Sequence, residues 1–261
     1  MIKSLNTAAT GMKAQQTNMD VIANNISNVS TTGFKKARAD FEELMYKTIK
    51  EPGARSGENS LSPTGVQVGL GVKTNAIQRD FVQGSTVITR NPFDIEISGA
   101  GFLPVQLPNG QIAYTRDGAL KKGADGRLVD KNGNLLQPEI AVPQDATGVD
   151  ISPDGQVRVV TGLNSVPQAI GQIQLVNFVN PAGLKSMGQN LFIPTNASGL
   201  PQQGIPGTNG MGVLAQGQLE TSNVNIVDEM VNMIGAQRAY ETNSKVIQAS
   251  DQMLQYMNNL R

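Results

Sequence analysis

The chain has 261 residues, and its 21 lysines and arginines balance its 21 aspartates and glutamates. This balance argues against a broadly basic surface for nucleic acid or anionic membranes. The sequence contains no cysteine, histidine or tryptophan, which excludes disulfides and thiolate nucleophiles and removes the side chain that most often transfers protons near neutral pH. The composition therefore favours a protein that recognises its partners by shape over one that catalyses a reaction.

Residues 1–29 predict a long helix, because apolar side chains recur every seven residues, the period of a helix that packs on another helix. The residues expected on this seam are Leu5, Met12, Met19, Ile22, Ile26 and Val29. Asn24, Asn25 and Asn28 lie beside its end, where a buried asparagine can fix the register between packed helices and solvent exposure is the alternative. The sequence from Ser30 to Gly33 is expected to end the helix, since hydroxyl groups compete for backbone hydrogen bonds and glycine adopts the left-handed conformation.

Residues 34–72 predict a connector. The part from Lys50 to Gly71 is rich in glycine, proline and serine, as flexible linkers are, and Pro52-Gly53 predicts a turn within it. Its end, "GVQVGLGV", alternates like a strand, so it is expected either to remain a linker or to pair with a sheet edge. The basic cluster "FKKARADF", residues 34–41, is more typical of a solvated surface than of a nucleic-acid site, so no nucleic-acid partner is predicted.

Residues 73–219 predict a mostly antiparallel β domain. Asn-Gly and Asp-Gly pairs, which favour tight hairpin turns, occur at 109–110, 117–118, 125–126, 132–133 and 154–155. The apolar stretch "AIGQIQLVNFVN" predicts one longer, buried strand. From Asp130, "DKNGNL" begins like a calcium loop, but its sixth and twelfth positions hold Leu135 and Ala141 instead of glycine and glutamate. No metal, cofactor or catalytic residue is therefore predicted.

The last 42 residues, 220–261, predict a second long helix. Asn225 is a candidate N-cap, and Asp228 and Glu229 follow in the first turn, where carboxylates suit the helix dipole. The residues expected on its seam are Ile226, Met230, Met233, Tyr240, Ile247, Leu254 and Met257. This segment carries five anions and three cations, whereas residues 1–38 carry five cations and one anion. The terminal helices are therefore expected to attract each other, or the same helices of neighbouring copies.

The predicted fold class is α+β. Residues 1–33 and 220–261 are expected to form one terminal helical domain, in which the two long helices pair as a coiled-coil-like layer. Both seams hold methionine, alanine and serine in place of a full set of leucines, so one helix pair buries only a modest apolar area. Further burial between molecules is then expected, and a contact repeated by a rotation that does not close builds a helical tube.

The two ends of the chain resemble a known family. "GMKAQQTNMDVIANNISNVSTTGFK" and "LETSNVNIVDEMVNMIGAQRAYETNSKVIQASDQML" resemble the paired terminal signatures of the bacterial flagellar rod and hook proteins, and "AYTRDGALKKGADGRLVDKNGNLLQP" resembles their shared β segment. The sequence departs from the usual pattern at Leu103-Pro104 and at Leu120. Within the family, the segment from Tyr46 to Val72 and the chain length are more similar to a distal rod subunit than to the hook protein, whose β region is usually larger.

The resemblance implies a structural subunit of the basal body and no enzymatic activity. Such a subunit polymerises into a rigid helical tube that crosses the periplasm and transmits torque from motor to hook during motility. The implied partners are copies of itself, the proximal rod proteins, the hook protein, the peptidoglycan and outer-membrane ring proteins, the rod cap and the flagellar type III export apparatus. Export by that route agrees with the expectation that no signal peptide is cleaved, since the first residues lack an apolar core of the required length.

The subunit interface is expected at both helix seams, at the three asparagines and at Pro52-Gly53. A hook or proximal rod subunit of the same family is the nearest alternative function. Two other classes are a peptidoglycan-cleaving enzyme, for which the sequence offers no opposed carboxylates or metal ligands, and a trimeric fibre protein, which would form a closed trimer in solution.

Overall fold

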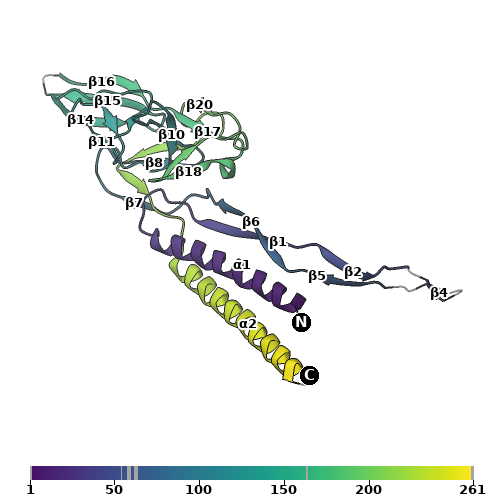
Figure 1. Cartoon of the computed structure of the whole chain (residues 1–261). Helices are drawn as coiled ribbons and strands as arrows, with labels where there is room; N and C mark the ends of the chain where they lie inside the picture. Colours follow the sequence, from purple (N-terminus) through teal and green to yellow (C-terminus); the bar gives the residue numbers. More distant parts are fainter. Residues whose placement is uncertain (1, 54, 58–59, 62–63, 163, 260–261) are drawn as a thin grey trace. The chain divides into compact units, whose positions relative to one another are not determined.

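The computed structural model of the chain describes residues 2–53, 55–57, 60–61, 64–162 and 164–259 (Figure 1). The chain folds into two compact units. The helical unit comprises Met1–Ser27, Ala37–Gln78 and Asn225–Arg261, and the β unit comprises Asn28–Lys36 and Arg79–Val224. The chain thus combines two long terminal helices with a mostly antiparallel β region, which confirms the predicted α+β class.

The two helices of the helical unit, α1 (Ile2–Ser27) and α2 (Ile226–Asn259), lie side by side (Figure 1). Half of the buried residues of the two helices in the described part of the chain are small, namely Ala8 and Ala14 of α1 and Ala236 and Ser250 of α2. A β-carbon at Gly11 would lie 3.0 Å from the amide nitrogen of Asn243. The helices therefore pair as predicted, and they approach each other through small residues.

The N-cap of α2 agrees with the sequence, whereas the end of α1 does not. The side-chain oxygen of Asn225 accepts a hydrogen bond of 3.0 Å from the backbone N–H of Val227, as an N-cap does. The first helix was predicted to run to Val29, but α1 ends two residues earlier, at Ser27, and Asn28 and Val29 lie in the following turn. The hydroxyl of Ser27 donates to the carbonyl of Ala23 at 2.8 Å, a bond that serine and threonine also make within a helix.

The strands of residues 37–79 form three successive pairs (Figure 1). These pairs are β1 (Ala37–Glu43) with β6 (Val72–Arg79), β2 (Tyr46–Lys50) with β5 (Val66–Gly69), and β3 (Arg55–Gly57) with β4 (Ser60–Leu61). Strand β5 pairs with β2, so of the two alternatives for "GVQVGLGV" the structure shows pairing with a strand edge. Residues 54, 58–59 and 62–63 of the expected linker lie outside the described residues.

The β unit is built around a seven-stranded antiparallel sheet in the order β11-β12-β13-β9-β10-β19-β18. Its strands are β11 (Lys121–Lys122), β12 (Leu128–Val129), β13 (Leu135–Leu136), β9 (Leu103–Gln106), β10 (Ile112–Thr115), β19 (Leu191–Ile193) and β18 (Lys185–Gly188). A three-stranded sheet consists of β14 (Ala146–Ile151), β15 (Gln156–Thr161) and β16 (Asn164–Gln172).

Three antiparallel strand pairs and a short helix complete the β unit. The pairs are β7 (Thr86–Ile88) with β22 (Gln218–Glu220), β8 (Ile95–Ser98) with β21 (Val213–Gln216), and β17 (Leu175–Asn177) with β20 (Gln202–Gly204). The short 3₁₀ helix is η1 (Pro181–Gly183). The predicted single strand "AIGQIQLVNFVN" is in fact divided between β16 and β17.

Four of the five expected turns connect paired antiparallel strands: 109–110, 125–126, 132–133 and 154–155. The prediction is wrong at Asp117-Gly118, which precedes β11 without forming a hairpin. The carbonyl of Gly118 accepts a hydrogen bond of 3.0 Å from the backbone N–H of Ile95, and a β-carbon at Gly118 would lie 1.6 Å from the carbonyl oxygen of Ile95. Glycine is required there because the backbone of β8 passes so closely.

The core of the β unit has an aliphatic and an aromatic part. The aliphatic part includes Ile95, Leu103, Leu128 and Ile173, and the aromatic part consists of Phe102, Tyr114, Val176, Phe178 and Phe192. The ring of Phe102 meets those of Phe81, Phe178 and Phe192 edge to face. In the part of the chain that the structure describes, no helix is sufficiently long and apolar to span a membrane.

Replacing Phe102 with alanine should remove about 3–5 kcal/mol of folding stability, because the ring is almost fully buried among other aromatic rings. Urea unfolding followed by tyrosine fluorescence measures this, since Tyr114 lies in the same cluster. Val179→Ala is the matched control, because that side chain is exposed and should change stability by no more than about 0.5 kcal/mol. Equal unfolding midpoints for both variants would contradict the role given to the aromatic cluster.

Candidate assembly surface

Helix α2 has two different faces. One face holds the buried side chains of Glu229, Ala236 and Ser250, which pack within the chain. The other carries the outer stripe, defined as Val227, Met230, Val231 and Ile234, whose spacing of three and four residues places them along one side of the helix. These four side chains are 67%, 54%, 63% and 48% exposed. A surface helix normally keeps this side polar, so the outer stripe indicates a contact with another molecule.

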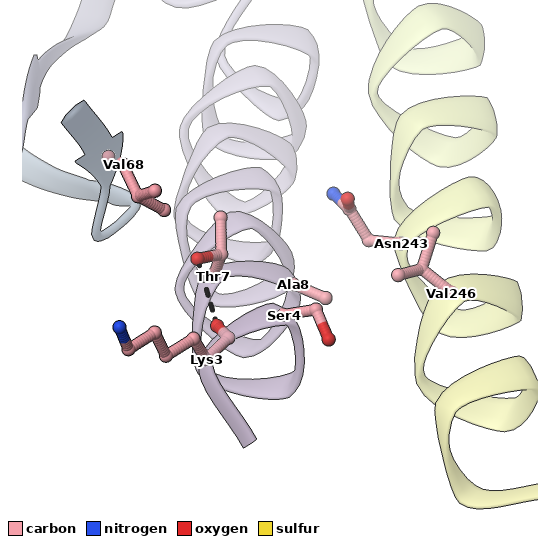
Figure 2. A pocket seen from close by; sticks show the side chains of 8 residues that line it. Lys3, Ser4, Thr7, Ala8, Val68, Asn243 and Val246 are labelled. Carbon is pink, nitrogen blue, oxygen red and sulfur yellow. Dashed lines mark hydrogen bonds between the residues drawn. The ribbon is translucent and has the colours of Figure 1, made fainter. Parts of the chain in front are cut away.

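A depression opens between the helices and strand β5 (Figure 2). Its volume is about 540 Å³, and its lining residues are Lys3, Ser4, Thr7, Ala8, Val68, Gly69, Asn243 and Val246. Lys3 is the one charged residue among these, and the hydroxyl of Thr7 donates to the Lys3 carbonyl at 3.0 Å as an ordinary helical side-chain bond. The lining offers neither a base nor a nucleophile arranged for chemistry, and it suits the side chain of a packed neighbour.

The structure places the expected interface residues in three different environments. Ile22 and Asn25 are buried within the chain, and Leu5, Met12, Met19, Ile26, Asn28, Val29, Met233, Ile247 and Leu254 are half-buried. Asn24, Pro52, Gly53, Ile226, Met230 and Tyr240 are exposed. Met257 lies in α2, but its side chain is outside the described part of the chain.

Sequence reasoning missed most of the outer stripe. The predicted α2 seam includes Met230 as a position between the seven-residue repeats, but it leaves out Val227, Val231 and Ile234. The signal was present, since these residues follow a second apolar spacing of three and four on the same helix. A search for a second face, in addition to one seam, would have found it.

Asn25 makes its contacts inside the helical unit. Its side-chain nitrogen donates to the carbonyl of Ala37 at 2.9 Å and to the carboxylate of Glu229 at 3.1 Å, and its side-chain oxygen accepts from the N–H of Ala37 at 2.9 Å. The side chain is 2% exposed. Asn25 therefore fixes the register of α1, β1 and α2 within one subunit.

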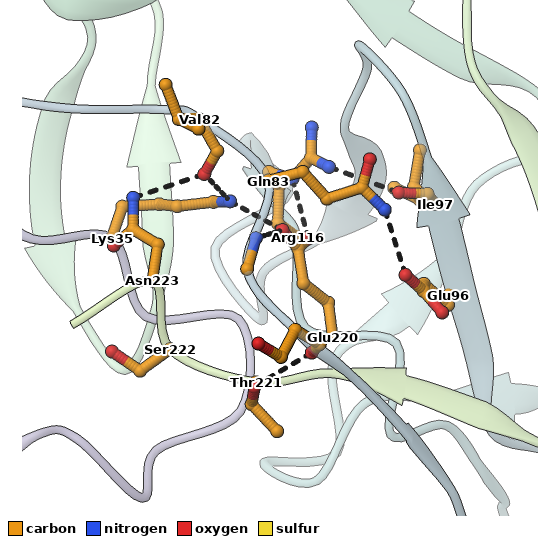
Figure 3. A network of polar contacts seen from close by, with 12 residues as sticks. Lys35, Val82, Gln83, Glu96, Ile97, Arg116, Glu220, Thr221, Ser222 and Asn223 are labelled. Carbon is orange, nitrogen blue, oxygen red and sulfur yellow. Dashed lines mark hydrogen bonds and ion pairs between the residues drawn. The ribbon is translucent and has the colours of Figure 1, made fainter. Parts of the chain in front are cut away.

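Glu220 is the centre of a buried ionic group in the β unit (Figure 3). One carboxylate oxygen accepts from the Lys35 ammonium at 2.6 Å and from the backbone N–H of Gly84 at 2.8 Å, and the other accepts from Arg116 Nε at 3.0 Å. The side chains of Lys35, Glu220 and Arg116 are 0%, 1% and 3% exposed. The expectation that the basic cluster at 34–41 is solvated is therefore wrong for Lys35, which has a buried carboxylate partner 185 residues away in sequence.

Backbone carbonyls satisfy the remaining donors of the two cations. Lys35 also donates to the carbonyl of Val82 at 2.7 Å. The Arg116 guanidinium donates to the carbonyls of Ile97, Gly99 and Gly101. Every buried side-chain nitrogen and oxygen in the described residues has a hydrogen-bond partner. A closed and saturated group of this kind positions segments of the chain and leaves no atom for chemistry.

The pKa values of this group follow from burial and from the opposite charges. Burial, with repulsion from Arg116, holds the pKa of Lys35 below its ordinary value, although Glu220 favours the ammonium form. Burial alone would raise the pKa of Glu220, but Arg116, Lys35 and the Gly84 N–H outweigh it and lower that pKa below 4.5. The ionised Glu220 therefore stabilises the folded protein fully above its ordinary pKa of 4.5, and this stabilisation is lost as the pH falls through its pKa in the folded protein.

Gly33 connects the segment after α1 to the backbone of Glu220. Its backbone N–H donates to the carbonyl of Glu220 at 2.9 Å, and its φ of +66° is a conformation that glycine adopts without strain. A β-carbon there would lie 2.8 Å from the backbone nitrogen of Asp117. Gly33 thus serves the packing of the β unit and does not end the helix.

Comparisons with known proteins match the N-terminal, central and C-terminal parts of the chain to flagellar proteins. Three family descriptions match: "Flagella basal body rod protein" at residues 5–35, "Flagellar hook protein FlgE/F/G D1 domain" at 96–159 and "Flagellar basal body rod FlgEFG protein C-terminal" at 215–260. The chain is 50% identical to the flagellar basal-body rod protein FlgG of Buchnera aphidicola subsp. Acyrthosiphon pisum over the full length of both chains. The chain belongs to the FlgG family of flagellar basal-body rod proteins.

Other FlgG proteins are similar over the same length. Identity is 50% with FlgG of Borreliella burgdorferi, covering 100% of this chain and 99% of that one, and 48% with FlgG of Caulobacter vibrioides, covering 100% of both. Membership of the FlgG family confirms that the chain is a structural protein of the flagellar basal body and not an enzyme. It also implies self-assembly and association with other axial components of the flagellum.

Replacing Glu220 with glutamine should cost about 3–5 kcal/mol of folding stability near pH 7, because Lys35 and Arg116 then remain as buried cations without an anion. Urea unfolding of both proteins between pH 3 and 7, a range set by the ordinary carboxyl pKa, measures the difference. The difference in stability should shrink as the pH falls below 4.5, because Glu220 is then protonated first in the unfolded chain and, at a lower pH, in the folded wild-type protein as well.

The control for this measurement is Glu139→Gln, which removes a half-exposed ion pair of 3.1 Å with Arg127. Exposed pairs contribute about 0–1 kcal/mol, so this variant should differ little from wild type at any pH. A wild-type unfolding midpoint for the Glu220 variant at neutral pH would show that the buried group does not stabilise the β unit.

Proposed function

We propose that the chain is a subunit of the distal rod and polymerises into a rigid helical tube that transmits torque from the motor to the hook. The observation that carries this proposal is the outer stripe of α2, four neighbouring apolar side chains that the subunit leaves uncovered on the side away from its buried contacts. The full-length similarity to FlgG proteins supports the assignment to the rod.

The outer stripe suits a contact between copies of the chain. Burying a valine, isoleucine or methionine side chain that was exposed contributes roughly 1.5–3 kcal/mol, and half-exposed side chains contribute less. The four residues of the stripe therefore supply enough apolar area for a weak contact that becomes stable when each subunit makes it with several neighbours. Because one face of α2 already packs within the subunit, the contact with a neighbour uses a different face, which permits a coiled-coil-like layer to extend from copy to copy.

The strand pairs of the helical unit offer a second apolar surface. Their exposed large side chains are Met45, Tyr46, Ile49, Val66 and Leu70. They lie on or beside β2 and β5, and Pro52 and Gly53 follow β2 in an exposed turn. In the assembled rod we place this strand pair between neighbouring copies, where it would resist their sliding past one another.

The interface then includes the outer stripe, the exposed seam residues Ile226, Met230 and Tyr240, and the turn at Pro52-Gly53. The half-buried seam residues complete it, namely Leu5, Met12, Met19, Ile26, Val29, Met233, Ile247 and Leu254, with Asn24 and Asn28 near the end of α1. Met257, whose side chain lies outside the described part of the chain, also belongs to the proposed interface. The neighbours of the tube would be the proximal rod proteins, the hook protein, the rod cap, and the peptidoglycan and outer-membrane ring proteins. The subunit would cross the periplasm in this tube after export by the flagellar type III apparatus without loss of a signal peptide.

Electron microscopy of the purified protein at increasing concentration tests the assembly. Dilute protein should be monomeric, because each single contact is weak, and concentrated protein should form helical tubes of constant diameter. A closed trimer at every concentration would contradict a rod subunit and favour a fibre protein.

Replacing Val231 with aspartate should raise the concentration needed for tube formation by on the order of tenfold or more, since a charge would be buried in the contact. The monomer should remain folded because the side chain is exposed. Sedimentation of tubes measures the first effect and thermal unfolding the second. The matched control is Asn232→Asp, which adds the same charge at an exposed position one residue along and about 100° around the helix. If both variants formed tubes at the same concentration, the outer stripe would not be part of the interface.

A further inference from the structure

Methionine is the only residue type of this chain that carries an oxidisable sulfur, because the sequence has ten methionines and no cysteine. Among the methionines whose side chains the structure describes, Met45, Met187, Met230 and Met253 are exposed, by 84%, 51%, 54% and 49%. Met211, in contrast, is buried in the aliphatic core of the β unit. An exposed thioether is open to oxidants in solution, and a buried one is protected. Oxidation therefore begins at the surface positions.

Met230 is surrounded by other apolar side chains of the outer stripe. Val227 precedes it by three residues, Val231 follows it directly, and Ile234 follows it by four. Residues three and four apart are neighbours on a helix surface, so apolar groups flank the Met230 side chain in both directions along α2. Its sulfur is consequently in the middle of the apolar surface that a second copy is proposed to cover.

The other three exposed methionines lie outside the outer stripe. Met45 lies between β1 and β2, Met187 lies in β18, and Met253 lies near the end of α2. Met187 belongs to the β unit and is about as exposed as Met230. It therefore offers the same chemistry at a similar exposure, on a surface to which no contact between copies is assigned.

Oxidation changes the chemical character of a methionine. A lone pair of the thioether sulfur attacks one oxygen of hydrogen peroxide, the O–O bond breaks, and the other oxygen leaves as water. The sulfur is oxidised to the sulfoxide and the peroxide is reduced. The sulfoxide is polar and carries a hydrogen-bond acceptor that the thioether lacked. Burying such an acceptor without a donor disfavours an apolar contact.

We propose that Met230 is an oxidation site that controls self-assembly. A peroxide that converts this side chain to the sulfoxide prevents the free subunit from joining the rod, whereas a subunit already in the rod is protected because its neighbour covers the sulfur. The modification is reversible, since methionine sulfoxide reductases restore the thioether while a thiol reductant is oxidised to a disulfide and the oxygen leaves as water. This inference rests on the proposed function, because it assigns a chemical sensitivity to the contact made by the outer stripe.

Hydrogen peroxide treatment of the dilute full-length protein, followed by removal of the peroxide, tests the site. Peptide mass spectrometry should show the sulfoxide at Met230 well before it appears at the buried Met211. Sedimentation of tubes should then show that the concentration needed for assembly has risen on the order of tenfold. Circular dichroism should be unchanged at that stage, because the Met230 side chain is exposed in the folded subunit.

Met230→Leu is the decisive variant, because leucine is apolar and of similar volume but has no sulfur. Both Met230→Leu and its reference protein carry Met45→Leu, since Met45 lies in the second apolar surface and its oxidation would add to the effect. Without peroxide the two proteins should assemble alike. After peroxide, Met230→Leu should assemble at a concentration at least about fivefold lower than the reference protein needs.

The matched control is Met187→Leu on the same reference protein, which removes a similarly exposed methionine from the β unit and should remain fully sensitive to peroxide. Methionine sulfoxide reductase with a thiol reductant should restore assembly of the oxidised reference protein, which damage to the fold would not allow. In tubes formed before the treatment, Met230 should stay reduced while it is oxidised in the monomer.

The oxidation site and the proposed function fail in different ways. Tubes that form equally well before and after oxidation, or equal sensitivity of Met230→Leu and Met187→Leu, would reject the oxidation site alone. Absence of tubes from the untreated wild-type protein would reject the rod subunit, and the oxidation-sensitive contact with it.

Discussion

The buried carboxylate of Glu220 is the interaction on which the β unit depends. A single anion lies between two cations, and each of them reaches backbone carbonyls from a different part of the chain. Removing ions from water is costly, and a buried ionic group is tolerable only when every donor and acceptor is satisfied. The group therefore stabilises one arrangement of three distant segments and disfavours any in which one of them is displaced.

This constraint explains why the β unit is discontinuous in sequence. Residues 28–36 belong to it although they are separated from the rest by the whole of the strand-pair segment 37–78. Lys35 brings its charge to Glu220, and Phe34 and Gly33 are buried beside it. Helices α1 and α2 belong to the other unit. These helices pack through small side chains and keep apolar residues on the surface, which suits elements that complete their packing with other subunits.

Most of the local structure follows from the sequence, and most of what differs depends on contacts between distant residues. The two helices, the Asn225 cap and four of the five hairpin turns were predictable from period and turn chemistry. The turn at Asp117-Gly118 was wrongly predicted because Gly118 is required by its close contact with the backbone of β8. The local sequence pattern does not reveal that contact. Lys35 was expected to be solvated because its partner, Glu220, is far away in sequence. Asn25 was assigned to a contact between subunits because the sequence pattern does not show whether the helix that it contacts belongs to the same chain or to a neighbour.

The hydrogen bond between Gly33 and Glu220 has a consequence for the entropy of the helix pair. Asn25 and Glu229 are 204 residues apart in sequence, and closing a loop of that length in a free chain costs about 5 kcal/mol. A folded β unit has already joined residue 33 to residue 220. The helices then need to close only the short tails beyond these two points, so two weakly apolar helices can pair in a single subunit where, as separate peptides, they would remain apart.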